Sequence, residues 1–438
     1  MLDIKFIREH KDEIKLAAKN KNIKIDIDRL LELDGERRDV MGRVEEFRAK
    51  RNELAKIGKT GKPTKEQIEE GKKLKEEIAK TEEELKTFED EYESLMVKVP
   101  TIPSADTPVG KDESGNIEVL KWGEIPNFDF KPKDHIELAE ALDIVDFDRG
   151  TKVAGYRGYY LKNEGAQLVM ALMMFAFEKM VSKGYAPIIP PTMIKEFALF
   201  GSGYFDGRQY NSETDNIYQV ATRDKDSTGE ESKEKKFLIG TAEPALLAYF
   251  SDEVFKEENL PIKVCGFSPC YRSEIGSYGK DTKGLYRVHE FFKIEQVVVS
   301  PADYDISTQL QEEMVGISEE LHRDLGLPYR KLQICTGDMS AGKYRAFDLE
   351  AWLPGTNRWA ETGSASNFAD WQARRLNVRY EDKKGDRKPV FLLNNTALPS
   401  VRPLIAILEY YQNADGSVTI PEVLRKYFPK GQDKIVKK

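Results

Sequence analysis

The sequence predicts an α+β protein in which an N-terminal antiparallel two-helix coiled-coil arm precedes one large domain of mixed helices and strands. Two observations predict the arm: a heptad pattern in the first hundred residues and an almost wholly charged surface outside that pattern. The third observation is that the rest of the chain alternates between strand-like and helical runs. The chain has 438 residues, of which 40% are hydrophobic, enough for two or three domains with a large buried core.

The arm is predicted from two runs in which seam residues recur three and four positions apart. The first run spans residues 28–57 without a proline, and after a break at 58–63 that contains glycine and proline, the second continues to Val99. At 1.5 Å per residue, about 30 residues per helix give a rod of roughly 45 Å. A bundle core is the alternative, but the charged faces outside the seam favour a rod in solvent. The seam residues are Leu33, Val40, Val44, Phe47, Arg51 and Leu54, then Leu74, Ile78, Thr81, Leu85, Phe88, Tyr92, Leu95 and Val99.

The net charge of −8 argues against a protein that binds nucleic acid over its whole surface, but the charge is unevenly distributed. Residues 48–75, around the tip, carry ten Lys and Arg and four acids, whereas residues 76–98 carry nine acids and three lysines. A charged run is usually only a solvated surface. Its segregation along the rod favours a partner with dense negative charge, bound at the tip. The basic residues of the tip are Arg48, Lys50, Arg51, Lys56, Lys59, Lys62, Lys65, Lys72, Lys73 and Lys75.

The sequence places the arm domain at residues 1–103, with its tip at about 58–64, then a polar linker at 104–116 and a second domain at 117–438. Prolines at the end of the second run cannot continue a helix. Residues 222–236 contain no apolar side chain, so we expect a mobile surface insertion there. In the second domain strands are expected at 186–190, 296–299 and 390–393, and helices at 165–183, 301–325 and 402–412.

The number and spacing of the cysteines, and the lack of a signal-peptide or membrane-spanning pattern, predict where in the cell the protein resides. The chain has three cysteines and no C-x-x-C, which argues against a zinc site or a disulfide framework and favours a reducing cytoplasm. The N-terminal residues are charged, unlike a signal peptide. The most apolar stretch, 168–181, is interrupted by Glu178 and Lys179 and is too short to cross a bilayer. We therefore expect a cytoplasmic protein without a membrane anchor.

The first group of residues whose chemistry suits a ligand site lies between residues 266 and 295. This segment is expected to form a strand, a loop and a second strand. Arg272 and Glu274, two positions apart at the end of the first strand, are expected to project from one face. The second strand carries the ring of Phe291 and the carboxylate of Glu295. An arginine for a phosphate, a glutamate for an amino group and a ring for stacking together suit an adenylate. The Arg-x-Glu tripeptide alone is better explained as a surface salt bridge.

The second such group, residues 393–404, reads as the end of a strand, a tight turn and the start of an apolar helix. Arg402 is expected at the N-terminus of that helix, next to Pro403, which is favourable at a helix start. A helix N-terminus and a guanidinium together form a suitable site for a polyphosphate. An arginine that only caps its own fold remains an equal alternative.

These motifs resemble those of the seryl-tRNA synthetase family, a class II aminoacyl-tRNA synthetase family, from end to end. Residues 266–296, GFSPCYRSEIGSYGKDTKGLYRVHEFFKIEQ, are similar to its second class motif, and residues 394–424 are similar to its third. Residues 165–191 resemble the first motif, and Thr241-Ala242-Glu243 and residues 360–380 resemble two further blocks. The resemblance implies a class II catalytic domain built on a mixed, mainly antiparallel sheet flanked by helices. The chain departs from the family pattern at Thr362, Gly363 and Ala365, where isoleucine, serine and cysteine are common.

The resemblance also implies roles for individual residues. Those implied to contact ATP are Arg272, Ser273, Glu274, Arg287, Val288, Phe291, Glu361, Thr362, Gly363, Ser364 and Arg402. Those implied to bind serine are Thr241, Ala242, Glu243, Arg272, Glu295 and Thr396. Mg²⁺ is implied at Glu361 and Ser364, and the catalytic residues would be Arg272, Arg402 and Glu361. The basic residues of the tip are implied to bind tRNA.

The implied reaction joins serine and ATP to give seryl-adenylate and then transfers serine to the 3′ end of tRNA(Ser), with tRNA(Sec) left open as a second substrate. None of the implied residues is an obvious nucleophile or general base, and His289 is expected to be structural. The resemblance also implies a homodimer through the first class motif, and the long apolar helix at 165–183 is consistent with such an interface. Two alternatives are a ligase that loads a carrier protein, whose relatives lack the arm, and a non-catalytic paralogue. The paralogue predicts the loss of Arg272, Glu274, Glu361 or Arg402, and all four are present.

Overall fold

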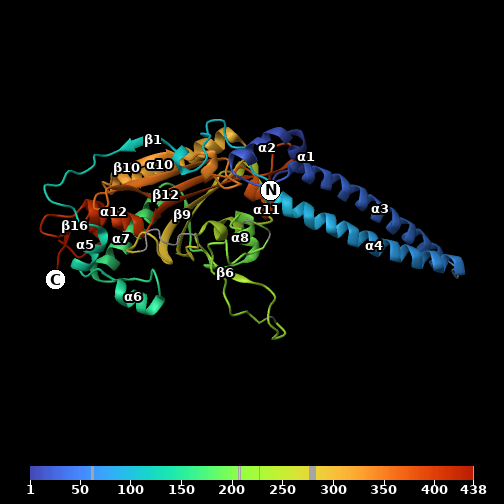
Figure 1. The fold of residues 1–438 in the computed structure, drawn as a ribbon, viewed down its shortest axis with the longest axis horizontal. Helices are drawn as coiled ribbons and strands as arrows, with labels where there is room; N and C mark the ends of the chain where they lie inside the picture. The colour runs from blue at the N-terminus through green and yellow to red at the C-terminus, as the bar shows by residue number, and fades with distance from the viewer. Residues whose placement is uncertain (61–63, 206, 208, 226, 276–282, 438) are drawn as a thin grey trace. The chain divides into compact units, whose positions relative to one another are not determined.

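The computed structural model describes residues 1–438 except residues 61–63, 206, 208, 226, 276–282 and 438, and the side chains of 57–60. The chain divides into two compact units, residues 1–100 and residues 101–438 (Figure 1). The first unit is wholly helical, and the second combines helices and strands. The predicted α+β composition therefore agrees with the structure.

The first unit is the predicted helical hairpin, preceded by two short helices. Its helices are α1 (Ile4–Glu9), α2 (Lys11–Asn20), α3 (Ile27–Thr60) and α4 (Lys65–Met96). α3 and α4 pack side by side along their length, as Figure 1 shows. Thr64 starts α4 with a capping box, in which its hydroxyl accepts from the Gln67 backbone and the Gln67 side chain accepts from the Thr64 backbone. The 34 residues of α3 give a rod of about 50 Å.

Every residue of the heptad seam except Arg51 is buried or half-buried. Val40, Val44, Ile78 and Tyr92 are among its buried residues. Arg51, which the heptad spacing places in the seam, is instead exposed, as expected of a charged side chain that has no buried partner to offset its desolvation. The helix also continues past its expected end at residue 57 to residue 60, because a single glycine inside a helix costs only about 1 kcal/mol relative to alanine.

The second unit is built on an eight-stranded sheet in the order β1-β10-β11-β12-β15-β9-β8-β4. All neighbouring strands are antiparallel except β4 and β8. This is the mixed, mainly antiparallel sheet that the resemblance implies. The strands are β1 (Ile117–Trp122), β4 (Ala186–Ile188), β8 (Ile262–Tyr271), β9 (Glu290–Ser300), β10 (Tyr329–Gln333), β11 (Arg345–Leu353), β12 (Arg358–Asn367) and β15 (Phe391–Pro399).

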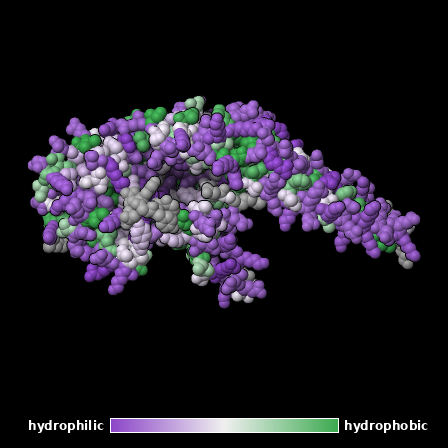
Figure 2. Space-filling view, in the orientation of Figure 1, coloured by the Kyte–Doolittle hydropathy of each residue, from purple (hydrophilic) through white to green (hydrophobic). Residues whose placement is uncertain are grey.

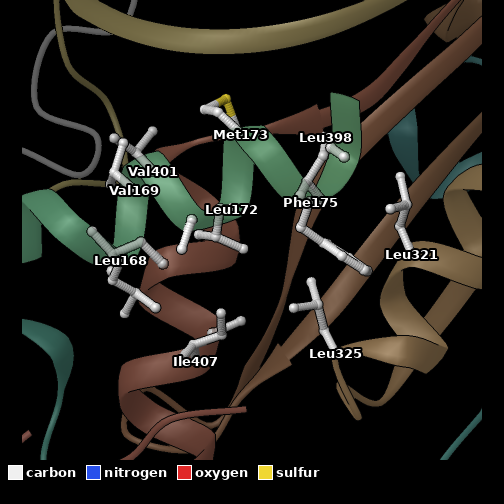
Figure 3. Close-up of a cluster of buried hydrophobic side chains, with 14 of the residues drawn as sticks. Leu168, Val169, Leu172, Met173, Phe175, Leu321, Leu325, Leu398, Val401 and Ile407 are labelled. Carbon is white, nitrogen blue, oxygen red and sulfur yellow. The ribbon is translucent and has the colours of Figure 1, made fainter. Parts of the chain in front are cut away.

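Three helices pack on the sheet and form its main core. They are α7 (Asn163–Ser182), α10 (Tyr304–Asp324) and α12 (Val401–Tyr410). In Figure 3, Leu168 and Leu172 of α7 meet Ile407 of α12, and Phe175 lies near Leu325 below α10, all within one buried cluster. By length and composition α7 could cross a membrane, but half of it is buried inside the protein. Burial of a leucine of this kind contributes about 1.5–3 kcal/mol, so these contacts fix the helices against the sheet.

The remaining elements are short and surround the sheet. The helices are α5 (His135–Ala141), α6 (Phe147–Ala154), α8 (Glu196–Ser202), α9 (Glu243–Ala248) and α11 (Trp371–Leu376). The strands are β2 (Val145–Asp146), β3 (Tyr160–Leu161), β5 (Met193–Lys195), β6 (Lys236–Leu238), β7 (Val254–Lys256), β13 (Arg379–Glu381), β14 (Arg387–Pro389), β16 (Val418–Thr419) and β17 (Lys434–Ile435).

Residues 104–116, predicted as a linker, are bound along the second unit. The backbone of Ser104 donates to the carbonyl of Tyr344 at 2.8 Å. Arg345 Nε lies 2.9 Å from the carboxylate of Asp106, and the backbone of Thr336 donates to Pro108 at 2.9 Å. These tertiary contacts hold the polar segment that was predicted as a linker along the second unit, beside the start of β11.

Residues 222–236, predicted as a polar insertion, precede β6 and form a protruding loop in Figure 1. Most of the described side chains in this loop are exposed. The loop folds back on itself, because the Ser232 backbone donates to Asp224 at 2.7 Å and Lys225 and Glu231 form a β-bridge.

Candidate active site

The hairpin of β8 and β9 carries the first group of predicted site residues. Arg272 and Glu274 of that group do not lie on a face of either strand. The ladder ends at the pair Tyr271 and Glu290, so Arg272 and Glu274 follow the strand. The expectation that both side chains project from one strand face is therefore wrong. Glu274 has φ +54°, which turns the chain away from the sheet. His289 Nδ1 lies 2.8 Å from the carbonyl of Arg272, a structural contact that holds this turn.

A pocket of about 470 Å³, partly open to solvent, lies where β8, β9, β12, β15 and α12 meet. Ten of the residues implied to bind ATP or serine line it: Arg272, Glu274, Arg287, Val288, Phe291, Glu361, Thr362, Gly363, Thr396 and Arg402. Four further lining residues were not predicted: Tyr286, Lys293, Pro399 and Val401. Ser273, Ser364, Thr241, Ala242, Glu243 and Glu295 do not line it. The structure thus brings both groups of predicted site residues to one cavity.

Arg402 lies in the first turn of α12, as predicted, and faces Glu361 of β12. Its Nη1 donates to the Glu361 carbonyl at 2.8 Å and lies 3.2 Å from the Glu361 carboxylate. Its guanidinium also lies 4.7 Å from the centre of the Tyr286 ring, and that ring faces Arg358 at 4.4 Å. Burial alone would raise the pKa of Glu361, but the guanidinium groups of Arg402 and Arg272 outweigh it and lower this pKa. Glu361 is therefore held as an anion beside two cations.

A second carboxylate, Asp348, lies beside the residues implied to hold Mg²⁺. Asp348 of β11 pairs directly with Ser364 of β12. Burial and the nearby charge of Glu361 raise the pKa of Asp348. Two carboxylates and a hydroxyl are ligands that suit a hard divalent cation. Among the residues described, no group of three or more His, Cys, Asp and Glu side chains could hold a metal ion, so ligands other than these side chains would complete the shell.

A largely buried polar group at the wall of the pocket consists of Thr241, Lys293, Glu295 and Thr396, of which Lys293 and Thr396 line the pocket and Thr396 is half-buried. Glu295 and Thr396 are register partners on β9 and β15. Thr241 Oγ1 donates to Glu295 Oε2 at 3.1 Å, and Lys293 Nζ donates to Thr396 Oγ1 at 3.2 Å. Lys293 also forms an ion pair with Glu295, with both side chains nearly excluded from solvent. Lys293 lies on the same face of β9 as Phe291 and Glu295, because every second residue of a strand points to one side. This spacing is the signal that could have identified Lys293.

Glu243, the first residue of α9, is buried behind this group. Its Oε1 accepts from Gln372 Nε2 at 2.8 Å and from Asn394 Nδ2 at 2.7 Å. The hydroxyl of Tyr204 donates to Oε2 at 3.3 Å. Burial first, and the charge of Glu295 second, raise the pKa of Glu243 to about 7. Ala242 beside it is fully buried and offers no side-chain hydrogen bond.

Thr362 is one of the positions at which the chain departs from the family pattern, and its hydroxyl contacts His322 of α10. The imidazole is fully buried, and its Nε2 lies 2.7 Å from Thr362 Oγ1. Its Nδ1 lies 2.7 Å from the carbonyl of Ser318, which can only accept, so Nδ1 carries the proton. Burial lowers the pKa of His322, which favours this neutral form. The hydroxyl at position 362 is thus satisfied inside the core.

Glu274 is flanked by two arginines, one of which sequence reasoning missed. Arg157 Nη1 lies 3.6 Å from Glu274 Oε2, and Arg287 Nη1 lies 3.4 Å from the same oxygen. Arg157 comes from the segment between α6 and β3, and its side chain is 3% exposed. The sequence separation of 117 residues left no local signal for this contact.

The predicted basic tip is exposed wherever the structure describes it. The exposed residues are Arg48, Lys50, Arg51, Lys56, Lys65, Lys72, Lys73 and Lys75. Lys62 and the side chain of Lys59 lie outside the described residues. Arg48 pairs with Glu82 at 2.6 Å and Lys50 with Glu46 at 2.6 Å, so two of these charges are neutralised locally. Figure 2 shows hydrophilic residues along most of this helical pair.

Comparison with known proteins assigns both units. Residues 1–103 match the seryl-tRNA synthetase N-terminal domain, and residues 218–411 match the class II tRNA synthetase core domain for G, H, P, S and T. A serine–tRNA ligase of Treponema denticola is 41% identical over 98% of each chain. The chain belongs to the seryl-tRNA synthetase family. A serine–tRNA ligase of Rubrobacter xylanophilus is 38% identical over 98% of this chain and 97% of the relative.

Solved structures of seryl-tRNA synthetases agree with this assignment. The enzyme of Pyrococcus horikoshii complexed with ATP has a TM-score of 0.86 and 36% identity, with full coverage of both chains. The cytoplasmic enzyme of Naegleria fowleri in complex with AMP has a TM-score of 0.83 and 31% identity, covering 100% of this chain and 99% of that one. The predicted family, fold class and activity are confirmed: the chain is a class II serine–tRNA ligase.

Proposed function

We propose that the pocket between β8, β9, β12, β15 and α12 activates serine with ATP, giving seryl-adenylate and pyrophosphate, before serine passes to the 3′ end of tRNA(Ser). The observation that carries this proposal is the convergence of Arg272, Arg402, Phe291 and the half-buried Thr396 in one cavity, with the buried Glu295 paired to Thr396 on the neighbouring strand. The ATP and AMP complexes of the Pyrococcus and Naegleria relatives support a nucleotide in this pocket.

Arg272 and Arg402 bind the phosphates of ATP, and the ring of Phe291 stacks on the adenine base. The carboxylate of serine attacks the α-phosphorus, the bond from that phosphorus to the bridging oxygen breaks, and pyrophosphate leaves with the electron pair. A carboxylate needs no general base, so catalysis depends on positioning and on neutralising the growing charge. The guanidinium of Arg272 lies over the Phe291 ring, 5.2 Å from its centre. Glu274 accepts from the adenine amino group.

Glu361, Ser364 and Asp348 would hold Mg²⁺. The oxygen chemistry of this set, and the repulsion between two adjacent carboxylates that a cation relieves, support the fit. Bound there, Mg²⁺ supplies positive charge to the polyphosphate. Arg402 assists by holding Glu361 through its carbonyl and its carboxylate, at 2.8 and 3.2 Å.

The buried polar group selects serine. Glu295 and Glu243 provide negative charge for the ammonium group of serine, and Thr241 and Thr396 provide hydroxyls of suitable reach. Because Lys293 donates to Thr396 Oγ1, the hydroxyl hydrogen of Thr396 is available to point toward the substrate hydroxyl. A site built to bond a hydroxyl rejects alanine strongly, since its polar groups would remain unpaired.

A homodimer and an arm that binds tRNA complete the proposal. Met170 and Met174 of α7, with Ile189, Met193 and Phe197, are large apolar side chains exposed to solvent, which supports an interface around the first class motif. The basic tip supports contact with the long arm of tRNA(Ser), and tRNA(Sec) remains the alternative substrate. The three cysteines are free and buried, which supports a reducing cytoplasmic location.

ATP–pyrophosphate exchange with each of the twenty amino acids tests the proposed activation step. We expect exchange with serine well above that with threonine, alanine and glycine. An Arg272→Ala variant should abolish exchange, whereas a Glu213→Ala variant, changed at an exposed surface position, should match the wild type. If serine supports no more exchange than alanine, the proposed pocket chemistry is wrong.

A further inference from the structure

Asn216 lies outside every family motif, yet its side-chain oxygen bonds two consecutive residues of the ATP site. Asn216 Oδ1 accepts from the backbone N–H of Glu274 at 2.5 Å and from the hydroxyl of Ser273 at 3.1 Å. A backbone N–H can only donate, so the amide oxygen must face Glu274. The contact joins segments 58 residues apart and ties the chain before β6 to the end of β8.

The backbone of Glu274 needs such a contact. Its φ of +54° lies in the left-handed region, which a glutamate rarely adopts. A conformation of this kind persists only where the surroundings hold it. Arg157 and Arg287 lie within 3.6 Å of the carboxylate, but no backbone group is held by either contact. The hydrogen bond that the Glu274 N–H donates to Asn216 acts on the backbone itself, and so it sets the direction in which the Glu274 side chain leaves the backbone.

Asn216 is presented by a turn that is braced internally. The backbone of Asn211 donates to Asp215 Oδ2 at 2.7 Å, and the backbone of Asp215 donates to the Asn211 carbonyl at 2.9 Å. The next residue, Ile217, is 2% exposed, and its carbonyl accepts from the hydroxyl of Tyr210 at 3.0 Å. The acceptor oxygen is therefore preorganised by buried contacts on one side and hydrogen bonds on the other.

We propose that Asn216 is a positioning residue that sets the preference of the ATP site for adenine by fixing the backbone of Glu274. The inference rests on the proposed function, in which Glu274 accepts from the adenine amino group. Hypoxanthine presents a carbonyl oxygen where adenine presents that amino group, so a correctly placed carboxylate accepts from ATP and repels ITP. When Glu274 is free to relax toward an extended backbone, its carboxylate moves and the discrimination falls.

The test is ATP–pyrophosphate exchange at saturating serine, with ATP and ITP varied in turn and the ratio of their kcat/KM values compared. Asn216→Ala should lower this ratio about tenfold, mainly through a higher KM for ATP, as the loss of one hydrogen-bonded constraint predicts. Asn216→Asp keeps an acceptor oxygen and should stay within about threefold of the wild type. Glu213→Ala, an exposed side chain on the same turn, is the control and should leave the ratio unchanged.

A double-mutant cycle with Glu274→Ala separates this inference from the proposed function. Glu274→Ala should lower the ratio by itself, and Asn216→Ala should add nothing in that background. If Asn216→Ala leaves the ratio unchanged while Glu274→Ala lowers it, the inference about Asn216 is refuted and the proposed function stands. If Glu274→Ala leaves the ratio unchanged, the adenine contact itself is wrong and both fall. An unchanged KM for serine in each variant shows that the fold is retained.

Discussion

Glu243 offers a direct test of the electrostatics of the serine pocket. Burial raises its pKa from 4.5 to about 7, so the folded state binds a proton more tightly than the unfolded state does. Below pH 4.5 both states are protonated and stability carries no penalty. As the pH rises toward 7, the unfolded carboxyl ionises first and stability is lost, and above 7 the loss is constant. Linkage between these pKa values gives a loss of about 2.5 kcal/mol between pH 5 and pH 8.

The variant Glu243→Gln isolates this effect, because glutamine keeps the shape and carries no charge at any pH. Urea unfolding of both proteins at fixed protein concentration, from pH 5 to pH 8, gives the difference in free energy of unfolding at each pH. We expect that difference to move in favour of the variant by about 2.5 kcal/mol as the pH rises. A fixed offset from altered hydrogen bonds cancels in this comparison. A difference that stays flat within about 0.5 kcal/mol would refute the assignment of a raised pKa to Glu243.

Three further predictions concern the arm, the phosphate site and the serine hydroxyl. Replacing residues 48–75 with a short turn should spare ATP–pyrophosphate exchange and reduce tRNA charging at least about a hundredfold, since phosphate contacts dominate affinity for RNA; equal loss of both activities would show that the tip does not serve tRNA alone. Arg402→Ala should lower the rate of adenylate formation at least about a thousandfold while the far-ultraviolet circular dichroism stays unchanged, and wild-type rates would exclude a catalytic role. Thr396→Val should reduce the preference for serine over alanine in exchange about tenfold, and an unchanged preference would mean that the hydroxyl is recognised elsewhere.

The sequence predicted best what depends on local pattern. The heptad spacing identified α3 and α4, because burial of a narrow apolar seam alone produces that periodicity. The position of Arg402 in the first turn of α12, which begins at Val401, followed from Pro403 and the apolar run behind it. The two strands β8 and β9 were predicted correctly, whereas residues 276–282 of the loop between them lie outside the described residues. The faces of Arg272 and Glu274 were predicted wrongly, because the point at which two strands stop pairing depends on both strands.

What the sequence missed depends on contacts between distant segments. Asp348 reaches Ser364 only through the register of β11 and β12, and no spacing in either strand reveals that register. Arg157 and Asn216 meet Glu274 from loops whose paths are set by tertiary packing. The role of Lys293 could have been predicted, because residues 291, 293 and 295 lie on the same face of β9. The apolar residues around Lys293 in the sequence made this signal hard to recognise.

The most direct test of the proposed function is to identify the aminoacyl-tRNA that the protein makes when all amino acids and all tRNAs are offered together. The protein is incubated with ATP, all twenty amino acids and total tRNA, and the aminoacyl-tRNA that forms is identified by mass spectrometry of its 3′-terminal nucleoside and by sequencing of the charged tRNA. We expect serine attached to tRNA(Ser) species, formed only when Arg272 and Arg402 are present. Charging with another amino acid, or serine released as the adenylate with no tRNA product, would contradict it.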